Sequence, residues 1–172
     1  MKKLIVSLFL LFGIYTQNFA QKNIVPTDSF TIKGNILKTL TVRLQNLSTY
    51  KIYNLGNVII RNHAGVIKDT AVQVKGVLLK DVLASIIFDA LNPKVVSEYY
   101  FVCTASDGYK IVFSWNELFN NQAGDHIFIV TEKQNTSGQN MYDRIALICP
   151  QDINTGRRFL KALQEIEIKR VP

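Results

Sequence analysis

The stretch GVLLKDVLASII, residues 76–87, holds the clearest helical pattern in the chain. Its apolar residues recur at the spacing of one helix face, at positions 79, 82, 83, 86 and 87. Two β-branched runs precede it, residues 58–61 and 66–74, and the turn-forming sequence Asn-His-Ala-Gly at residues 62–65 separates them. We therefore expect a β-hairpin that leads directly into a helix.

Alternating apolar and polar residues on both sides of this unit predict further strands. Upstream, residues 29–37 alternate and turn at Gly34, and residues 40–47 form a second strand or a strand that runs into a helical turn. The polar residues 134–140 indicate a loop. Downstream, strands are expected at residues 99–105, 109–113, 127–130, 144–149 and 166–168.

A second short helix is expected at Ser114, where the sequence Ser-Trp-Asn-Glu has the pattern of a capping box. In that motif the serine hydroxyl accepts from the N–H of Glu117, and the glutamate side chain returns to the N–H of the serine. The chain has the size of one domain and can bury a core without disulfides or a structural metal. The sequence thus predicts one mixed α+β domain over residues 29–172, mostly β-sheet, with two or three short helices.

The first residues have the pattern of a secretory signal. Lys2 and Lys3 precede an apolar run over residues 4–15, and Ala20 is a small residue before the expected cleavage point. We expect residues 1–20 to be removed and residues 21–28 to form a flexible mature N-terminus. The apolar run is short for a membrane helix, so no membrane span is expected in the mature chain, which would be periplasmic or secreted.

The charge pattern argues against a nucleic-acid partner. Removal of Lys2 and Lys3 lowers the formal net charge from +7 to +5, and the other basic residues are single or paired. No dense basic run with interleaved aromatic residues occurs, which indicates a solvated, mildly basic surface. His63 and His126 have no acidic cluster beside them and are expected to be solvated or capping residues.

Cys103 and Cys149 are the only cysteines. An oxidising destination would permit a disulfide between them, but both lie in strongly apolar stretches where a free cysteine acts as a small hydrophobic residue. Neither belongs to a C-x-x-C pair, so redox or metal chemistry has no local support. A bridge and two buried thiols both stay open at this point.

One ordered set of segments is more specific than any single motif. It comprises residues 76–83, the strand over 100–103 that leads into Ser-Asp-Gly-Tyr at 106–109, residues 113–118, residues 147–152 followed by Arg158, and residues 166–168. In this order the chain resembles the oxidoreductase molybdopterin-binding domain of the sulfite oxidase family, particularly its small single-domain bacterial members. The resemblance implies β-sheets and short helices around a pterin cleft.

The chain departs from that family where the metal would bind. In catalytic members a cysteine thiolate ahead of a G-V-P-L element binds molybdenum, but residues 54–66 contain no cysteine and Leu78 replaces the proline. A thiolate is a soft anchor that neighbouring side chains cannot replace, so catalytic molybdenum is not expected. Cys103 and Cys149 lie in other segments and do not correspond to that ligand.

The resemblance also suggests cofactor-binding residues. Tyr109 falls near an active-site tyrosine of some members, and Arg157 and Arg158 fall near cations that face the cofactor phosphate. A core tyrosine and surface cations are the alternatives. The signal carries no twin-arginine pair, whereas exported molybdopterin enzymes normally travel folded with their cofactor by that route.

We therefore expect an exported module that binds a small anionic ligand or a partner protein, with no bound cofactor. The alternative is a molybdopterin-dependent oxidoreductase or an accessory subunit of one, in which Arg157 and Arg158 would help to hold molybdopterin. A structural role in an envelope complex also fits the sequence.

Overall fold

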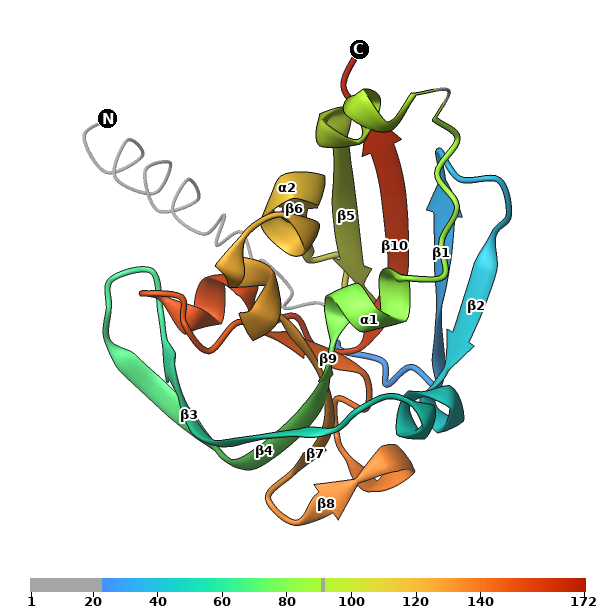
Figure 1. Ribbon diagram of the computed structural model, residues 1–172. Coiled ribbons are helices and arrows are strands. Elements are labelled where there is room, and N and C mark those ends of the chain that lie inside the picture. The colour runs from blue at the N-terminus through green and yellow to red at the C-terminus, as the bar shows by residue number, and fades with distance from the viewer. Residues whose placement is uncertain (1–22, 91) are drawn as a thin grey trace, which may run out of the picture.

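The computed structural model describes residues 23–90 and 92–172, which form two five-stranded sheets (Figure 1). The first sheet has the order β2 (Leu40–Arg43), β1 (Ser29–Gly34), β10 (Leu163–Arg170), β5 (Tyr99–Ala105), β6 (Lys110–Ser114). The second has the order β3 (Tyr53–Arg61), β4 (Ile67–Leu78), β7 (Phe128–Lys133), β8 (Thr136–Ser137), with β9 (Ala146–Ile148) also paired to β7. The pairing of β1 with β10 is parallel and all other strand pairs are antiparallel.

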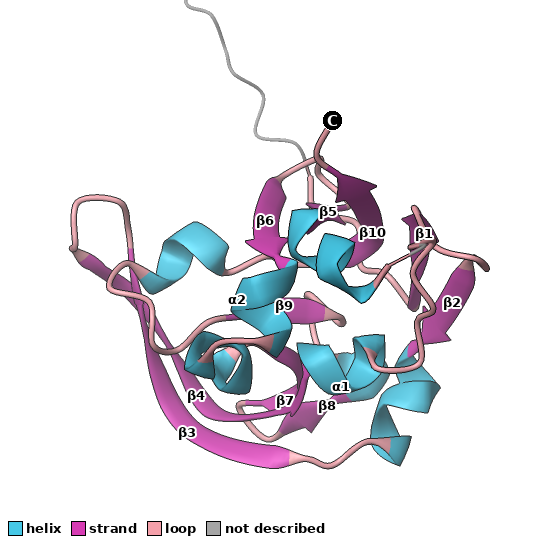
Figure 2. Ribbon diagram, turned by 45° about the horizontal axis from the view of Figure 1, so that its top comes forward, coloured by secondary structure: helices cyan, strands magenta, loops and turns pink. Residues whose placement is uncertain are grey.

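The short helical segments lie between the strands. Among the described residues, two of them are α-helices, α1 (Leu79–Leu83) and α2 (Trp115–Phe119), which lie side by side between the β3–β4 hairpin and the sheet that holds β5 and β10 (Figures 1 and 2). The remainder are 3₁₀ turns: η2 (Leu44–Thr49), η3 (Pro93–Glu98), η4 (Gln122–His126), η5 (Gly138–Asn140) and η6 (Thr155–Arg158). The expected α+β class, mostly β-sheet with few short helices, is confirmed.

Strand β7 shows how the second sheet is buried on both faces. Successive side chains of a strand point to opposite sides. Ile129 packs into the main core, which both sheets and α1 share, whereas Phe128 and Val130 pack into a second apolar cluster on the other face. An uninterrupted apolar run is typical of such a strand.

The expected hairpin is confirmed, and it is longer than its β-branched residues suggested. The Asn62 side chain closes the turn by accepting from the N–H groups of Ala64 and Val66, both at 3.0 Å. Gly65 has φ +77°, a conformation that glycine adopts at no steric cost.

The helix expected after Gly76, with its apolar face at residues 79–87, is confirmed only over its first part. Strand β4 runs on to Leu78, which pairs with Phe128, and α1 ends at Leu83. The prediction is wrong for residues 84–87 because tertiary pairing takes over. The carbonyl of Ile87 accepts from the N–H of Leu37 at 3.0 Å, so this segment joins the turn after β1.

Residues 25, 27 and 28 make hydrogen bonds to the domain, and the flexibility expected over residues 21–28 stays a prediction. The N–H of Val25 donates to Ser106 Oγ at 3.0 Å and Thr27 Oγ1 donates to the Leu163 carbonyl at 2.8 Å. Asp28 accepts from Arg144 at 2.5 Å. Residues 21 and 22, and the expected signal, lie outside the described residues. No helix in the described part of the chain is long and apolar enough to cross a membrane.

Candidate functional site

A basic pocket of about 290 Å³ lies between the tip of the β3–β4 hairpin and η6. The two segments lie side by side at the end of the hairpin (Figure 1). The hairpin supplies most of the lining and η6 supplies the rest: Ile60, Arg61, Asn62, His63, Lys68, Gly156 and Arg157. The turn at 62–65 reverses the chain, so that Arg61 pairs with Ile67 and Lys68 follows that pair on the returning strand.

Thr155 fastens η6 to the outer edge of β3. Its hydroxyl accepts from the N–H of Arg61 at 2.8 Å and donates to the Ile59 carbonyl at 2.7 Å. These two backbone groups would otherwise be unpaired at the sheet edge. Gly156 permits the close approach, since a Cβ there would lie 2.6 Å from the Arg61 carbonyl oxygen. The pocket walls are therefore held in place without a ligand.

The pocket has an excess of positive charge. Arg61 Nη1 donates to the Gly65 carbonyl at 3.2 Å, a contact that leaves its charge unmatched. Within residues 23–90 and 92–172, none of Arg61, His63, Lys68 and Arg157 takes part in an ion pair, and the lining contains no acidic residue. Exposed cations gathered in a hollow raise the local concentration of anions.

Tyr109 lies next to this pocket and is tied to it. Its hydroxyl donates to the Arg157 carbonyl at 2.6 Å, and its N–H donates to Asp107 Oδ1 at 2.8 Å. The Tyr109 side chain is 42% exposed, which rules out the core tyrosine that we considered. Tyr109 and Arg157, two of the three residues suggested by the resemblance, are thus brought together through the Arg157 backbone.

Arg158 points to a different environment. Its guanidinium makes two hydrogen bonds to Asp152, at 2.8 and 2.5 Å, and a third to Glu117, and it lies 4.9 Å from the ring centre of Phe113. These carboxylates, Asp152 first, raise the pKa of Arg158 above its ordinary value. Its charge is matched inside the protein, and it does not line the basic pocket.

The contact with Arg158 also changes the capping motif at α2. Ser114 Oγ accepts from the N–H of Glu117 at 3.0 Å, as expected. The Glu117 carboxylate pairs with Arg158 in place of the return bond to the cap. A charged partner gives a stronger hydrogen bond than a backbone N–H, which accounts for the difference.

Cys103 and Cys149 are buried free thiols in this structure, which does not contain the disulfide considered from the sequence. Both pack into the main core, Cys103 on β5 and Cys149 just after β9. Burial raises the pKa of Cys103, and it raises the pKa of Cys149 to about 12 although Arg158 opposes the shift. Apolar surroundings therefore keep both as neutral thiols.

These thiols do not fit the metal that the family resemblance implies. A molybdenum ligand must be a thiolate that faces a cleft, whereas Cys103 and Cys149 are protonated and enclosed. Among the described residues no group of three or more His, Cys, Asp or Glu side chains is placed to hold a metal ion. The donors that could meet the phosphate of a pterin are those of the basic pocket.

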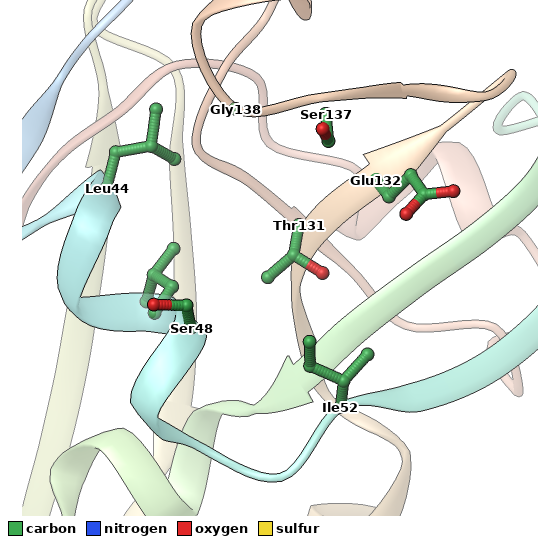
Figure 3. Close-up of a pocket in the computed structure, with 8 residues that line it drawn as sticks. Leu44, Ser48, Ile52, Thr131, Glu132, Ser137 and Gly138 are labelled. Carbon is green, nitrogen blue, oxygen red and sulfur yellow. The ribbon is translucent and has the colours of Figure 1, made fainter.

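A further pocket, of about 220 Å³, lies between η2 and the β7–β8 segment (Figure 3). Leu44, Leu47 and Ile52 make it largely apolar. Figure 3 shows the Ser48 and Thr131 hydroxyls on opposite walls, and Glu132 binds Lys75 at 3.0 Å. This pocket offers an anion no free cation.

Sequence reasoning missed Arg61, Lys68, Thr155 and Gly156, and it assigned His63 no ligand. The predicted hairpin could have placed Arg61, His63 and Lys68 at one end of a sheet. The approach of η6 to that end had no sequence signal, because the Thr155 contacts join residues 94 and 96 positions apart.

Comparison with known proteins supports the fold and leaves the activity open. No family model matches the chain, and no curated protein matches it. A solved structure that it resembles is the sulfane dehydrogenase SoxCD from Paracoccus pantotrophus, with a TM-score of 0.58 and 13% identity. The match covers 83% of this chain and 39% of that chain, so this domain spans well under half of its neighbour. The likeness supports a distant sulfite-oxidase-like fold.

Proposed function

We propose that this chain is an exported binding module that keeps a sulfite-oxidase-like fold, lacks catalytic molybdenum and binds a small oxyanion in the basic pocket. The observation that carries the proposal is the unmatched charge of the lining, with Arg61, Lys68 and Arg157 around one hollow and no acidic residue in it. A surface of scattered cations would have no such concentration.

The residue types suit an oxyanion. Guanidinium groups present forked donors that match carboxylate, sulfate or phosphate oxygens, and the ammonium of Lys68 adds a mobile point charge. Thr155 and Gly156 hold the walls before the ligand arrives, which reduces the entropy lost on binding. The volume of about 290 Å³ lies at the small end of ligand pockets and favours a small molecule.

Isothermal titration calorimetry with inorganic phosphate and sulfate tests the proposal. Arg157→Ala should weaken binding about tenfold, the value of one charge-assisted contact. The matched control is Arg43→Ala, because Arg43 is exposed on β2 and lines none of these pockets. Absence of binding by the unaltered protein, or equal weakening in both variants, would refute the proposal.

The alternative role is an accessory or catalytic part of a molybdopterin enzyme, which the fold likeness favours. In that role the cations of the basic pocket would hold the cofactor phosphate. Metal analysis and cofactor fluorescence of protein purified from its native host distinguish the two roles. Stoichiometric molybdenum or pterin would replace the proposed function with this one, and a stable complex in a native pull-down would favour a partner-binding role.

Export itself is tested by cell fractionation and N-terminal sequencing of the native protein. A mature chain that begins at Gln21 outside the cytoplasm supports a cleaved secretory signal. An intact Met1 on cytoplasmic protein contradicts it.

A further inference from the structure

We propose that the ligand of the basic pocket is an organic oxyanion whose single aromatic ring enters a second, adjoining pocket. This inference rests on the proposed function and adds the chemical class of the ligand. The second pocket has a volume of about 270 Å³ and lies on the other side of Gly156, which lines both hollows. The site therefore has a cationic part and a neighbouring part of different character.

The second pocket offers a mixed surface, with two aromatic rings and two aliphatic side chains beside polar groups. Tyr109 and Phe159 contribute rings, while Ile24 and Ala105 contribute aliphatic atoms. Aromatic rings bind well against such side chains in edge or offset arrangements. Asp107, the acidic residue in this lining, is engaged by the N–H of Tyr109 at 2.8 Å.

One hydrogen bond joins the two parts into one site. The Tyr109 hydroxyl donates to the Arg157 carbonyl at 2.6 Å, so the same residue walls the aromatic part and fixes the backbone of the cationic part. Within the aromatic part, Lys161 Nζ lies 5.3 Å from the ring centre of Phe159 and adds a positive charge to the lining. A ring with an attached phosphate, sulfate or carboxylate satisfies both parts at once.

Size limits the body of the ligand. The two hollows, of about 290 and 270 Å³, each lie at or below the lower limit for drug-sized ligands. One charged group can occupy the first hollow and one ring the second. The N-terminal segment forms one wall of the aromatic part, because Ile24 belongs to its lining and the N–H of the adjacent Val25 donates to Ser106 Oγ at 3.0 Å.

The experiment compares methyl phosphate with phenyl phosphate by calorimetry, because the two esters carry the same anionic group and differ in the body. Burial of the ring should make phenyl phosphate bind about tenfold more tightly. Ile24→Ala should reduce the affinity for phenyl phosphate about threefold and leave methyl phosphate unchanged. Ile52→Ala is the matched control, since Ile52 lines the separate pocket of Figure 3.

The outcomes separate this inference from the proposed function. Equal affinities for the two esters would overturn the aromatic part while the oxyanion site stands. A preference for phenyl phosphate that Ile24→Ala leaves intact, or that Ile52→Ala also removes, would overturn its placement beside Tyr109. If no binding of inorganic phosphate, sulfate or either ester is detected, the proposed oxyanion function is refuted, and this inference is refuted with it.

Discussion

Arg157 and Arg158 are neighbours in sequence, yet they belong to opposite kinds of environment. Arg158 is partly buried and matched by Asp152 and Glu117, whereas Arg157 is exposed and lacks an ion-pair partner among the described residues. Matched charges stabilise a fold and unmatched ones attract ligands. One dipeptide therefore separates a structural cluster from a binding surface, and a residue type alone does not reveal which role it has.

The largest change in stability is expected when the ion pairs of Arg158 are removed. Arg158→Met leaves Glu117 and Asp152 without their cation, and we expect a loss of about 3 kcal/mol in the free energy of unfolding. Urea denaturation measures it. Arg157→Met is the control and should cost less than about 0.5 kcal/mol. Similar losses in the two variants would contradict the contrast between the arginines.

A smaller change in stability is expected at Thr155, which holds η6 against the edge of β3. Thr155→Val removes the hydroxyl that bridges Arg61 and Ile59. It should lower the free energy of unfolding by about 1–2 kcal/mol and also weaken phosphate binding. Thr155→Ser keeps the hydroxyl and should preserve both properties. A stable Thr155→Val protein with unchanged affinity would show that η6 needs no such fastening.

The buried Cys149 thiol should make the stability of the fold depend on pH. The folded-state pKa of Cys149 is raised from 9.0 to about 12, so this thiol stabilises the fold fully below pH 9, and its contribution is lost as the pH rises through 9 to 12. Between pH 7.5 and 9.5 the thiol should account for a loss of about 1 kcal/mol. Chemical denaturation of Cys149→Ala at the two pH values should show a smaller decline than the unaltered protein, and an equal decline would contradict burial as the cause.

The smallest change in stability should accompany the largest change in binding. Arg157→Glu reverses a charge at an exposed position, so we expect less than about 0.5 kcal/mol in unfolding free energy and loss of detectable phosphate binding. Added salt should weaken binding to the unaltered protein, because screening acts on exposed cations. Phosphate binding that changes neither with Arg157→Glu nor with added salt would show that Arg157 faces away from the ligand.

Local patterns predicted the strands and the hairpin because period-2 alternation and turn residues are properties of short segments. They failed where distant segments compete for the same groups. Residues 84–87 have a helical pattern, but the Ile87 carbonyl accepts from Leu37 in the turn after β1. The Glu117 carboxylate likewise pairs with Arg158 instead of the cap.

In the candidate site too, local patterns predict some of the residues, and contacts between distant segments bring in the others. Arg61, His63 and Lys68 share a hairpin end that the sequence predicts, whereas their meeting with Arg157 depends on Thr155 and Gly156 reaching the edge of β3. Tyr109 was identified through the family resemblance, and its contact with Arg157 joins positions 48 residues apart. No local pattern contains a contact of that range.

The parallel pairing of β1 with β10 has a kinetic consequence. Thr31 lies opposite Glu165 in the central part of the first sheet, so a strand from the start of the domain is completed only by one from its end. Loops of this length make such pairings slow to form, and synthesis delivers the N-terminal strand first. Strands β1 and β2 must therefore wait as an isolated, marginal hairpin until Leu163–Arg170 is available. The first sheet therefore cannot be completed until β10 emerges, whereas the strands of the second sheet are all available earlier.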